Sequence, residues 1–292
     1  MSNELNPIST ELRAYTPARI ALARTGASLT TRDALDFTLA HAQARDAVHT
    51  ALSLPSLLAA LHARKLPAIS VKSAAPDRVT YLRRPDLGRT LSPASRALLA
   101  SESPAPTETP RLTIILADGL SALATDRHAL PLLDALLPLL NAQTNAQTEA
   151  FSAAQNVDKS VDKLDKTPHS GWLLTPIVLA EQARVALGDE IGQALGASLT
   201  LMLLGERPGL SAADSLGAYL TWAPAPGRTD AQRNCISNIR AGGLDPAAAA
   251  ARIAFYLREA RRLSLTGTAL KDPPPGPHAL PTANSTPAIE PA

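Results

Sequence analysis

The chain is poor in cysteine, in aromatic residues and in charge of one sign. Its 292 residues include a single cysteine, Cys235, which excludes an intramolecular disulfide and any zinc site built from several cysteines. Aromatic residues make up only 3%, too few for a platform on which nucleic-acid bases stack. The 28 Lys and Arg residues against 26 Asp and Glu leave a net charge of +2, which excludes a strongly basic nucleic-acid binder.

Long apolar runs are also missing. The best candidate, residues 129–140, is shorter than the roughly 18 residues that a transmembrane helix needs, and two prolines and an aspartate interrupt it. Residues 1–15 are polar and lack the apolar centre of a secretory signal. A lone cysteine suits a reducing compartment. We therefore expect a soluble, cytoplasmic protein.

The motifs of common nucleotide-binding and hydrolytic enzymes are absent as well. The sequence has no G-x-G-x-x-G, no G-x-x-x-x-G-K-[ST] and no G-x-S-x-G, the loops that hold phosphates or present a nucleophilic serine. Its six histidines show no metal-ligand spacing. A stand-alone nucleotide-dependent α/β enzyme would need a phosphate-binding glycine loop after its first strand, and Asp118-Gly119 does not supply one.

What the sequence does contain is an alternation of short apolar runs with helical patterns. The runs are residues 111–117, 172–180, 199–204 and 216–222. Continuous apolar runs between helices are typical of parallel strands that are buried on both faces. The order of strand and helix predicts an α/β fold.

Helices are predicted at both ends of this region. Thr30 begins one that carries Leu35 and Leu39 on a single stripe, and a second covers residues 56–64. Near the other end, Asp245 followed by Pro246 is a good helix start. We predict an N-terminal helical segment (1–65), one domain (66–271) with a disordered polar insert at about 141–170, and a disordered Pro-rich tail (272–292).

Three loops are expected at the carboxyl edge of the sheet, where ligands bind in open parallel sheets. Each carries an acidic residue at or just after a strand end: Asp118, Glu181 and Glu206. A carboxylate there can accept hydrogen bonds from amide or hydroxyl groups of a ligand. The alternative is that each one caps the next helix.

Two further features are open to two interpretations each. Gly188, Gly192 and Gly196 recur every four residues, which allows either the close approach of a flat ligand or tight packing of a helix on the sheet. Cys235 has no histidine nearby to act as a base, so it is either a structural residue or an apolar contact to a ligand.

Five motifs carry a family resemblance. They are YLRRPDLGR (81–89), ADGLS (117–121), ARVALGDEIG (183–192), LGERPGL (204–210) and NCISNI (234–239). Over roughly residues 12–271 the chain resembles the small subunit of ethanolamine ammonia-lyase, an adenosylcobalamin enzyme. The last two motifs, in this order and at this separation, are highly specific together.

The resemblance implies a Rossmann-like, mostly parallel sheet with flanking helices that holds adenosylcobalamin against the ethanolamine ammonia-lyase large subunit. The family converts ethanolamine to acetaldehyde and ammonia, and its substrate site lies on the large subunit. The cobalamin contacts of the family fall on Val185, Glu206 and Cys235. No catalytic residue and no metal ligand is expected on this chain. The resemblance leaves open whether a bacterial microcompartment encloses the enzyme.

Two alternatives from other classes remain at this point. One is the nucleotide-binding α/β enzyme discussed above. The other is an assembly protein without a ligand.

Overall fold

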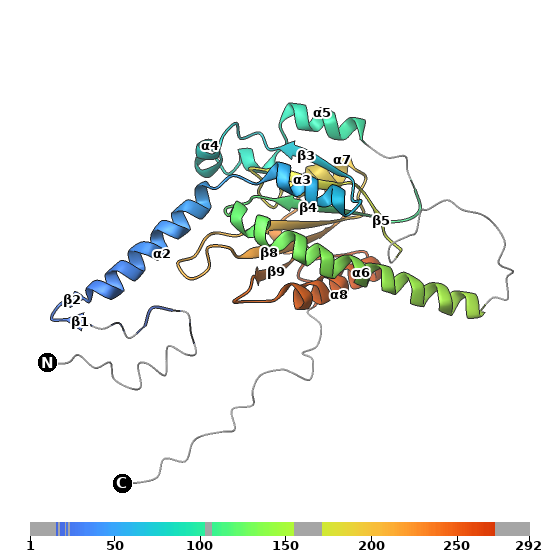
Figure 1. Ribbon diagram of the computed structural model, residues 1–292. Coiled ribbons are helices and arrows are strands. Elements are labelled where there is room, and N and C mark those ends of the chain that lie inside the picture. Colours follow the sequence, from blue (N-terminus) through green and yellow to red (C-terminus); the bar gives the residue numbers. More distant parts are fainter. Residues whose placement is uncertain are drawn as a thin grey trace, which may run out of the picture.

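The apolar runs of the sequence form the central strands of the computed structural model, which describes residues 16, 18–20, 22, 24–102, 107–154 and 171–271 (Figure 1). In spatial order the sheet contains β3 (Ala68–Lys72), β6 (Ile177–Glu181), β4 (Arg111–Ala117), β7 (Leu199–Gly205), β8 (Leu216–Trp222) and β9 (Arg233–Ile239), with the short β5 (Leu173–Leu174) beside β4. The run at 172–180 is divided between β5 and β6 around Pro176, because proline has no N–H to donate to the sheet.

The direction of the strands confirms an α/β fold but not a mostly parallel, Rossmann-like sheet. Strands β3, β6, β4 and β7 are parallel, but β8 runs antiparallel to β7, and β9 runs antiparallel to β8. The sheet is therefore mixed. The physical reason is the connection from β7 to β8, residues 206–215, which holds no helix. A parallel return needs a crossover of about a dozen residues or more, usually a helix, whereas an antiparallel return does not.

Helices cover the two faces of the sheet unequally. On one face lie α3 (Leu54–Ala63), α6 (Ala122–Ala154) and α8 (Pro246–Leu263), and on the other lie α5 (Pro93–Ser101) and α7 (Leu187–Ala194) (Figure 1). Alternate residues of β7 serve the two cores: Leu201 and Leu203 pack on the α6–α8 side, and Met202 and Leu204 on the α7 side. The connections also contain α4 (Arg78–Arg83) and two 3₁₀ turns, η1 (Leu87–Arg89) and η2 (Asp230–Gln232).

The N-terminal helix α2 (Thr31–His49) starts where the sequence predicts. The hydroxyl of Thr30 accepts a hydrogen bond from the backbone N–H of Asp33. Its predicted apolar stripe is not buried against the described residues, because Leu35 is 63% exposed and Leu39 is 58% exposed. Figure 1 shows α2 extending away from the sheet, with the small hairpin of β1 (Arg24–Thr25) and β2 (Ser28–Leu29) at its outer end.

Two other helices extend beyond their predicted bounds. Pro55 was expected to precede the second helix, but it lies in the first turn of α3, where proline is tolerated. Helix α6 was expected over 129–140, and instead it continues to Ala154 with two prolines inside. Residues 141–154 of the predicted insert are therefore helical. The rest of the insert and the tail at 272–292 lie outside the described residues, and the division at residue 65 stays a prediction.

The last helix, α8, is as predicted. The carboxylate of Asp245 accepts hydrogen bonds from the backbone N–H groups of the first turn, and Pro246 follows it. The four residues predicted on its inward face are each at least 97% buried: Ile253, Tyr256, Leu257 and Ala260. In the part of the chain that the structure describes, no helix is long and apolar enough to cross a membrane.

Candidate functional site

The carboxyl ends of β4 and β7 meet closely at the edge of the sheet. The backbone N–H of Leu120 donates to the carbonyl of Gly205 over 2.9 Å. Gly119 lies between them with φ +55°, and a Cβ on it would collide with Gly205. The loops after these two strands therefore form one surface, as the sequence predicts for the edge of a parallel sheet.

Asp118 is engaged by the protein itself. Its carboxylate accepts hydrogen bonds from the N–H of Gln182 (2.8 Å) and of Ala183 (3.0 Å), and it pairs with Arg78 at 3.2 Å. Burial raises the pKa of Asp118 to about 6, against the opposing effect of the Ala183 N–H and the Arg78 charge. Asp118 thus joins the β4 and β6 loops, and it is neither a cap of α6 nor a group turned toward a ligand.

Glu181, the second acidic residue of this edge, also has a partner within the chain. Its carboxylate lies 3.5 Å from the ammonium group of Lys72, which ends the neighbouring strand β3. The helix that follows Glu181 has Ala186 at its N-cap position. The capping interpretation therefore does not apply to Glu181, and its contact with a ligand stays a prediction.

Glu206 differs from these two because only one of its oxygens is engaged. Its Oε2 accepts a hydrogen bond from the hydroxyl of Ser215 (2.6 Å) and a long one from the backbone N–H of Asn238 (3.5 Å). Among the described residues, none donates a hydrogen bond to Oε1. These contacts fix the carboxylate at the end of β7 and leave one acceptor atom for another molecule.

Gly217 shows which way the Glu206 side chain lies. A Cβ on Gly217 would come within 2.8 Å of Glu206 Oε1 and within 2.9 Å of the Tyr219 ring. Both side chains therefore lie over β8 on the same face of the sheet. Glycine is required here because any side chain would displace one of them.

Cys235 lies beside Tyr219 in the next strand. The two residues are directly paired between β8 and β9, and the Tyr219 hydroxyl hydrogen-bonds the cysteine sulfur. Cys235 is exposed as a residue. The loss of water around its sulfur raises the pKa of the thiol; the Tyr219 hydrogen bond lowers it, and the nearby charge of Glu206 raises it further. The thiol is thus protonated at neutral pH, which agrees with a contact residue and not with a nucleophile.

Val185 reaches the same face from the β6–α7 loop. It is half-buried, and it packs against the apolar core cluster on the α7 side, as Tyr219 does. It also lines a cavity of about 400 Å³ next to the β8–β9 connection. The structure thus places Val185, Glu206 and Cys235, the three residues taken from the resemblance, on one side of the sheet.

This side of the sheet is covered over the parallel strands and open over the antiparallel ones. Met202 of β7 is 2% exposed, since it faces α7, whereas Cys235 and Ser237 of β9 are exposed. Within the described residues, no helix covers that part of β9. The result is an uncovered patch of sheet with Glu206 at one margin and Tyr219 in its middle, which we call the β8–β9 face.

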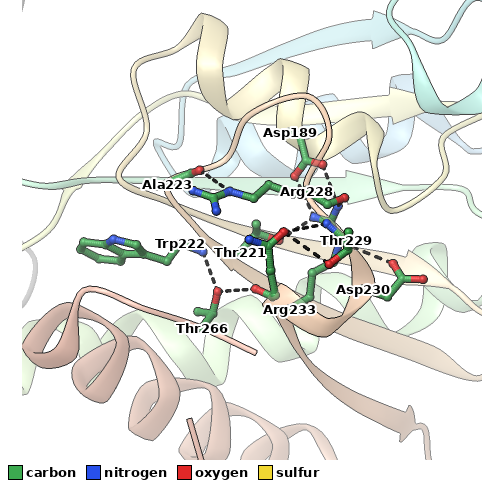
Figure 2. Close-up of polar contacts among 10 residues, drawn as sticks. Asp189, Thr221, Trp222, Ala223, Arg228, Thr229, Asp230, Arg233 and Thr266 are labelled. Atoms are coloured by element: carbon green, nitrogen blue, oxygen red, sulfur yellow. Dashed lines mark hydrogen bonds and ion pairs between the residues drawn. The ribbon is translucent and has the colours of Figure 1, made fainter. Parts of the chain in front are cut away.

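A buried ion pair joins this face to α7 (Figure 2). The guanidinium of Arg233 donates two hydrogen bonds of 2.7 Å to the carboxylate of Asp189, and their side chains are only 3% and 2% exposed. Arg233 also donates to the hydroxyl of Thr221 and to the carbonyl of Arg228. It thereby ties the β8–β9 connection to the helix.

Sequence reasoning missed both Tyr219 and the Arg233–Asp189 pair. Each partner lies in or beside a motif that was recognised, but their contacts depend on the antiparallel pairing, which was not predicted.

Gly192 was open to two interpretations, the approach of a flat ligand or tight packing of a helix. A Cβ on it would strike Thr200 and Pro224, so this glycine serves close packing of α7. Within the ranges that the structure describes, no group of three or more His, Cys, Asp or Glu could hold a metal ion.

Comparison with known proteins agrees with these motifs. A family model described as "Ethanolamine ammonia-lyase light chain" matches residues 7–158 and 148–271. Proteins named ethanolamine ammonia-lyase small subunit are similar along most of their length. The one from Bradyrhizobium diazoefficiens is 50% identical over 262 residues, which cover 90% of this chain and 89% of that protein.

The similarity extends to other bacteria. The protein from Azotobacter vinelandii is 49% identical over 90% of this chain and 87% of its own length. The protein from Pseudomonas fluorescens is 50% identical over 90% and 86%. This chain belongs to the ethanolamine ammonia-lyase light chain family. The family resemblance derived from the five motifs is thereby confirmed.

Proposed function

We propose that this chain is the small subunit of an ethanolamine ammonia-lyase and that its β8–β9 face holds adenosylcobalamin against the large subunit. The complex converts ethanolamine to acetaldehyde and ammonia in the cytoplasm. The observation that carries the proposal is the uncovered patch of sheet that holds Glu206 and Cys235, with Val185 on the same side of the sheet. This patch offers a flat macrocycle a surface that no described helix covers, whereas the parallel strands are covered on this side by α7.

The residues on this face fit a corrin ring and its amide side chains. Glu206 Oε1 is an acceptor without a described donor, which suits an amide N–H of the corrin edge. Ser215 and the Asn238 N–H hold the other oxygen, so the carboxylate does not need to be ordered at the moment of binding. Val185 and Tyr219 offer apolar contact, and the small side chain of Cys235 allows close approach.

When bound, adenosylcobalamin supplies radical chemistry through homolysis of its cobalt–carbon bond. The residues of this chain bind and orient: Glu206 fixes one edge of the ring, and Tyr219 keeps water from the strand beneath it. We place the residues that contact ethanolamine on the large subunit, as the family resemblance implies. The chain is a binding subunit of the enzyme.

The test is reconstitution. The chain is co-expressed with the large subunit, and acetaldehyde formation from ethanolamine and adenosylcobalamin is measured for the complex and for each subunit. We expect activity from the complex and none from this chain by itself. Acetaldehyde formed by the purified chain without the large subunit would contradict the assignment of the chemistry.

A second readout separates this proposal from a ligand-free assembly protein. Cobalamin absorbs visible light, so its retention by the complex after gel filtration is measured directly. Retention of one corrinoid per small subunit supports the proposal. An active complex whose small subunit can be removed without loss of the corrinoid would contradict it.

A further inference from the structure

A positively charged cavity adjoins the β8–β9 face. It has a volume of about 400 Å³ and lies between the β6–α7 loop, the η1 turn and the β8–β9 connection. Four arginines line it, Arg89, Arg184, Arg228 and Arg233, against one acidic residue, Asp230. Val185 also lines it, so the cavity begins where the proposed corrin surface ends.

Most of this positive charge is not neutralised by the chain. Arg233 is paired with Asp189, which is buried beneath the cavity. Asp230 lies 3.6 Å from Arg233 and is itself fully solvent-exposed, so it screens little. Three guanidinium groups, those of Arg89, Arg184 and Arg228, remain without an acidic partner among the described residues.

The arginines are arranged to bind and not merely to be solvated. The guanidinium of Arg184 lies 4.5 Å from the centre of the Tyr81 ring, and its buried Nε has no hydrogen-bond partner. The Nε of Arg228 donates to the carbonyl of Ala223, which orients the remaining N–H groups. The terminal N–H groups of Arg184 and Arg228 have no acceptor among the described residues, which leaves them available to an anionic ligand.

We propose that this cavity binds a phosphate ester, and that the ester is the phosphodiester in the nucleotide tail of the corrinoid. Arginine binds phosphate through paired N–H donors, and three arginines match the charge spread over its oxygens. The cavity is larger than a free phosphate requires, which suits an ester with its attached sugar. The assignment to the corrinoid tail rests on the proposed function, whereas the binding of a phosphate ester does not.

The experiment compares two corrinoids on the reconstituted complex. Cyanocobalamin carries the nucleotide tail, and cobinamide lacks both the nucleotide and its phosphate. Arg89→Gln and Arg228→Gln are introduced together, because neither side chain is buried. Arg252→Gln on the exposed side of α8 is the control, since it removes a positive charge on the opposite face of the sheet.

We expect the double variant to weaken cyanocobalamin binding by roughly tenfold or more, the loss typical of a charge-assisted hydrogen bond. Cobinamide binding should be unchanged, and the Arg252 variant should bind both as the parent complex does. Equal weakening of both corrinoids, or no weakening of cyanocobalamin, would overturn the assignment to the tail.

A titration of the chain by itself with inorganic phosphate at low chloride tests the anion site separately from its assignment to the corrinoid tail. Saturable phosphate binding that the double variant loses supports the anion site, even if the complex binds no corrinoid and the proposed function fails. Phosphate binding that the variant loses while cyanocobalamin affinity stays constant would assign the cavity to free phosphate and overturn its link to the corrinoid. No saturable binding of phosphate or cyanocobalamin would overturn the site altogether.

Discussion

The parallel and antiparallel halves of the sheet differ in how far the α7 side of their strands is buried. In one row across the sheet, Met202 of β7 pairs with Tyr219 of β8, and Tyr219 pairs with Cys235 of β9. All three lie on the α7 side, yet Met202 is buried, Tyr219 is half-buried and Cys235 is exposed. Burial on both faces makes the parallel half part of the stable core, whereas the antiparallel half is uncovered around Tyr219 and Cys235.

The largest effect is expected at the boundary between the two halves. Asp189→Ala leaves the Arg233 guanidinium buried without its carboxylate, which should lower the free energy of unfolding by about 3–5 kcal/mol. Urea unfolding measures it. Asp134→Ala, which breaks the more exposed ion pair with Arg64, is the control and should cost less than about 1 kcal/mol. Equal losses in both variants would contradict the structural role of the buried pair.

The next comparison uses two residues of the same row. Met202→Ala removes a side chain that is packed against α7, and we expect a loss of about 2–5 kcal/mol in the free energy of unfolding. Cys235→Ala on the open half should change it by no more than about 0.5 kcal/mol. Thermal and urea unfolding of both variants measure the difference. A large destabilisation by Cys235→Ala would mean that the β8–β9 face is part of the core.

Cofactor affinity, unlike stability, is expected to depend more on the open half of the sheet than on the buried half. Glu206→Ala removes the acceptor at the margin of the β8–β9 face and should weaken cobalamin binding to the complex by about 1–3 kcal/mol, with little change in folding. Glu181→Ala, whose carboxylate is paired with Lys72, is the matched control and should leave affinity unchanged. Indistinguishable cobalamin dissociation constants for the parent complex and the Glu206 variant would assign Glu206 to loop structure.

The smallest effect concerns the acidity of the Cys235 thiol. Burial raises its pKa and the charge of Glu206 raises it further, so alkylation by iodoacetamide should reach half its maximal rate at a higher pH than for free cysteine. Glu206→Gln removes one negative charge and should shift this midpoint to lower pH. Glu259→Gln on α8, on the opposite face of the sheet, should not shift it. An upward shift in the Glu206 variant would contradict the proximity of the two side chains.

The sequence predicts the strands best where both faces are buried. Strands β4 and β8 have the predicted bounds, because every residue of β4 and nearly every residue of β8 is apolar or packed. Strand β9 was not predicted, because only its first, fourth and last residues are buried. The pattern of its other positions is typical of a polar loop. The open face of β9 is what removes the signal of a strand.

The site was predictable in its residue types and not in its contacts. Val185, Glu206 and Cys235 came from the family motifs, and nothing in their spacing shows that Tyr219 lies among them. The antiparallel return of β8 creates that arrangement. The absence of a helical pattern between Glu206 and Ser215 was the available signal for it, because a connection without a helix favours an antiparallel pair.

The central claim is that the β8–β9 face lies against the corrinoid, and Cys235 reports on it directly. It is the only cysteine in the chain, so the mass of the small subunit after iodoacetamide treatment measures its modification alone. The complex with the large subunit is labelled with and without saturating adenosylcobalamin. We expect the cofactor to slow modification of Cys235 severalfold beyond any protection by the large subunit. The same rate with and without bound cofactor would contradict it.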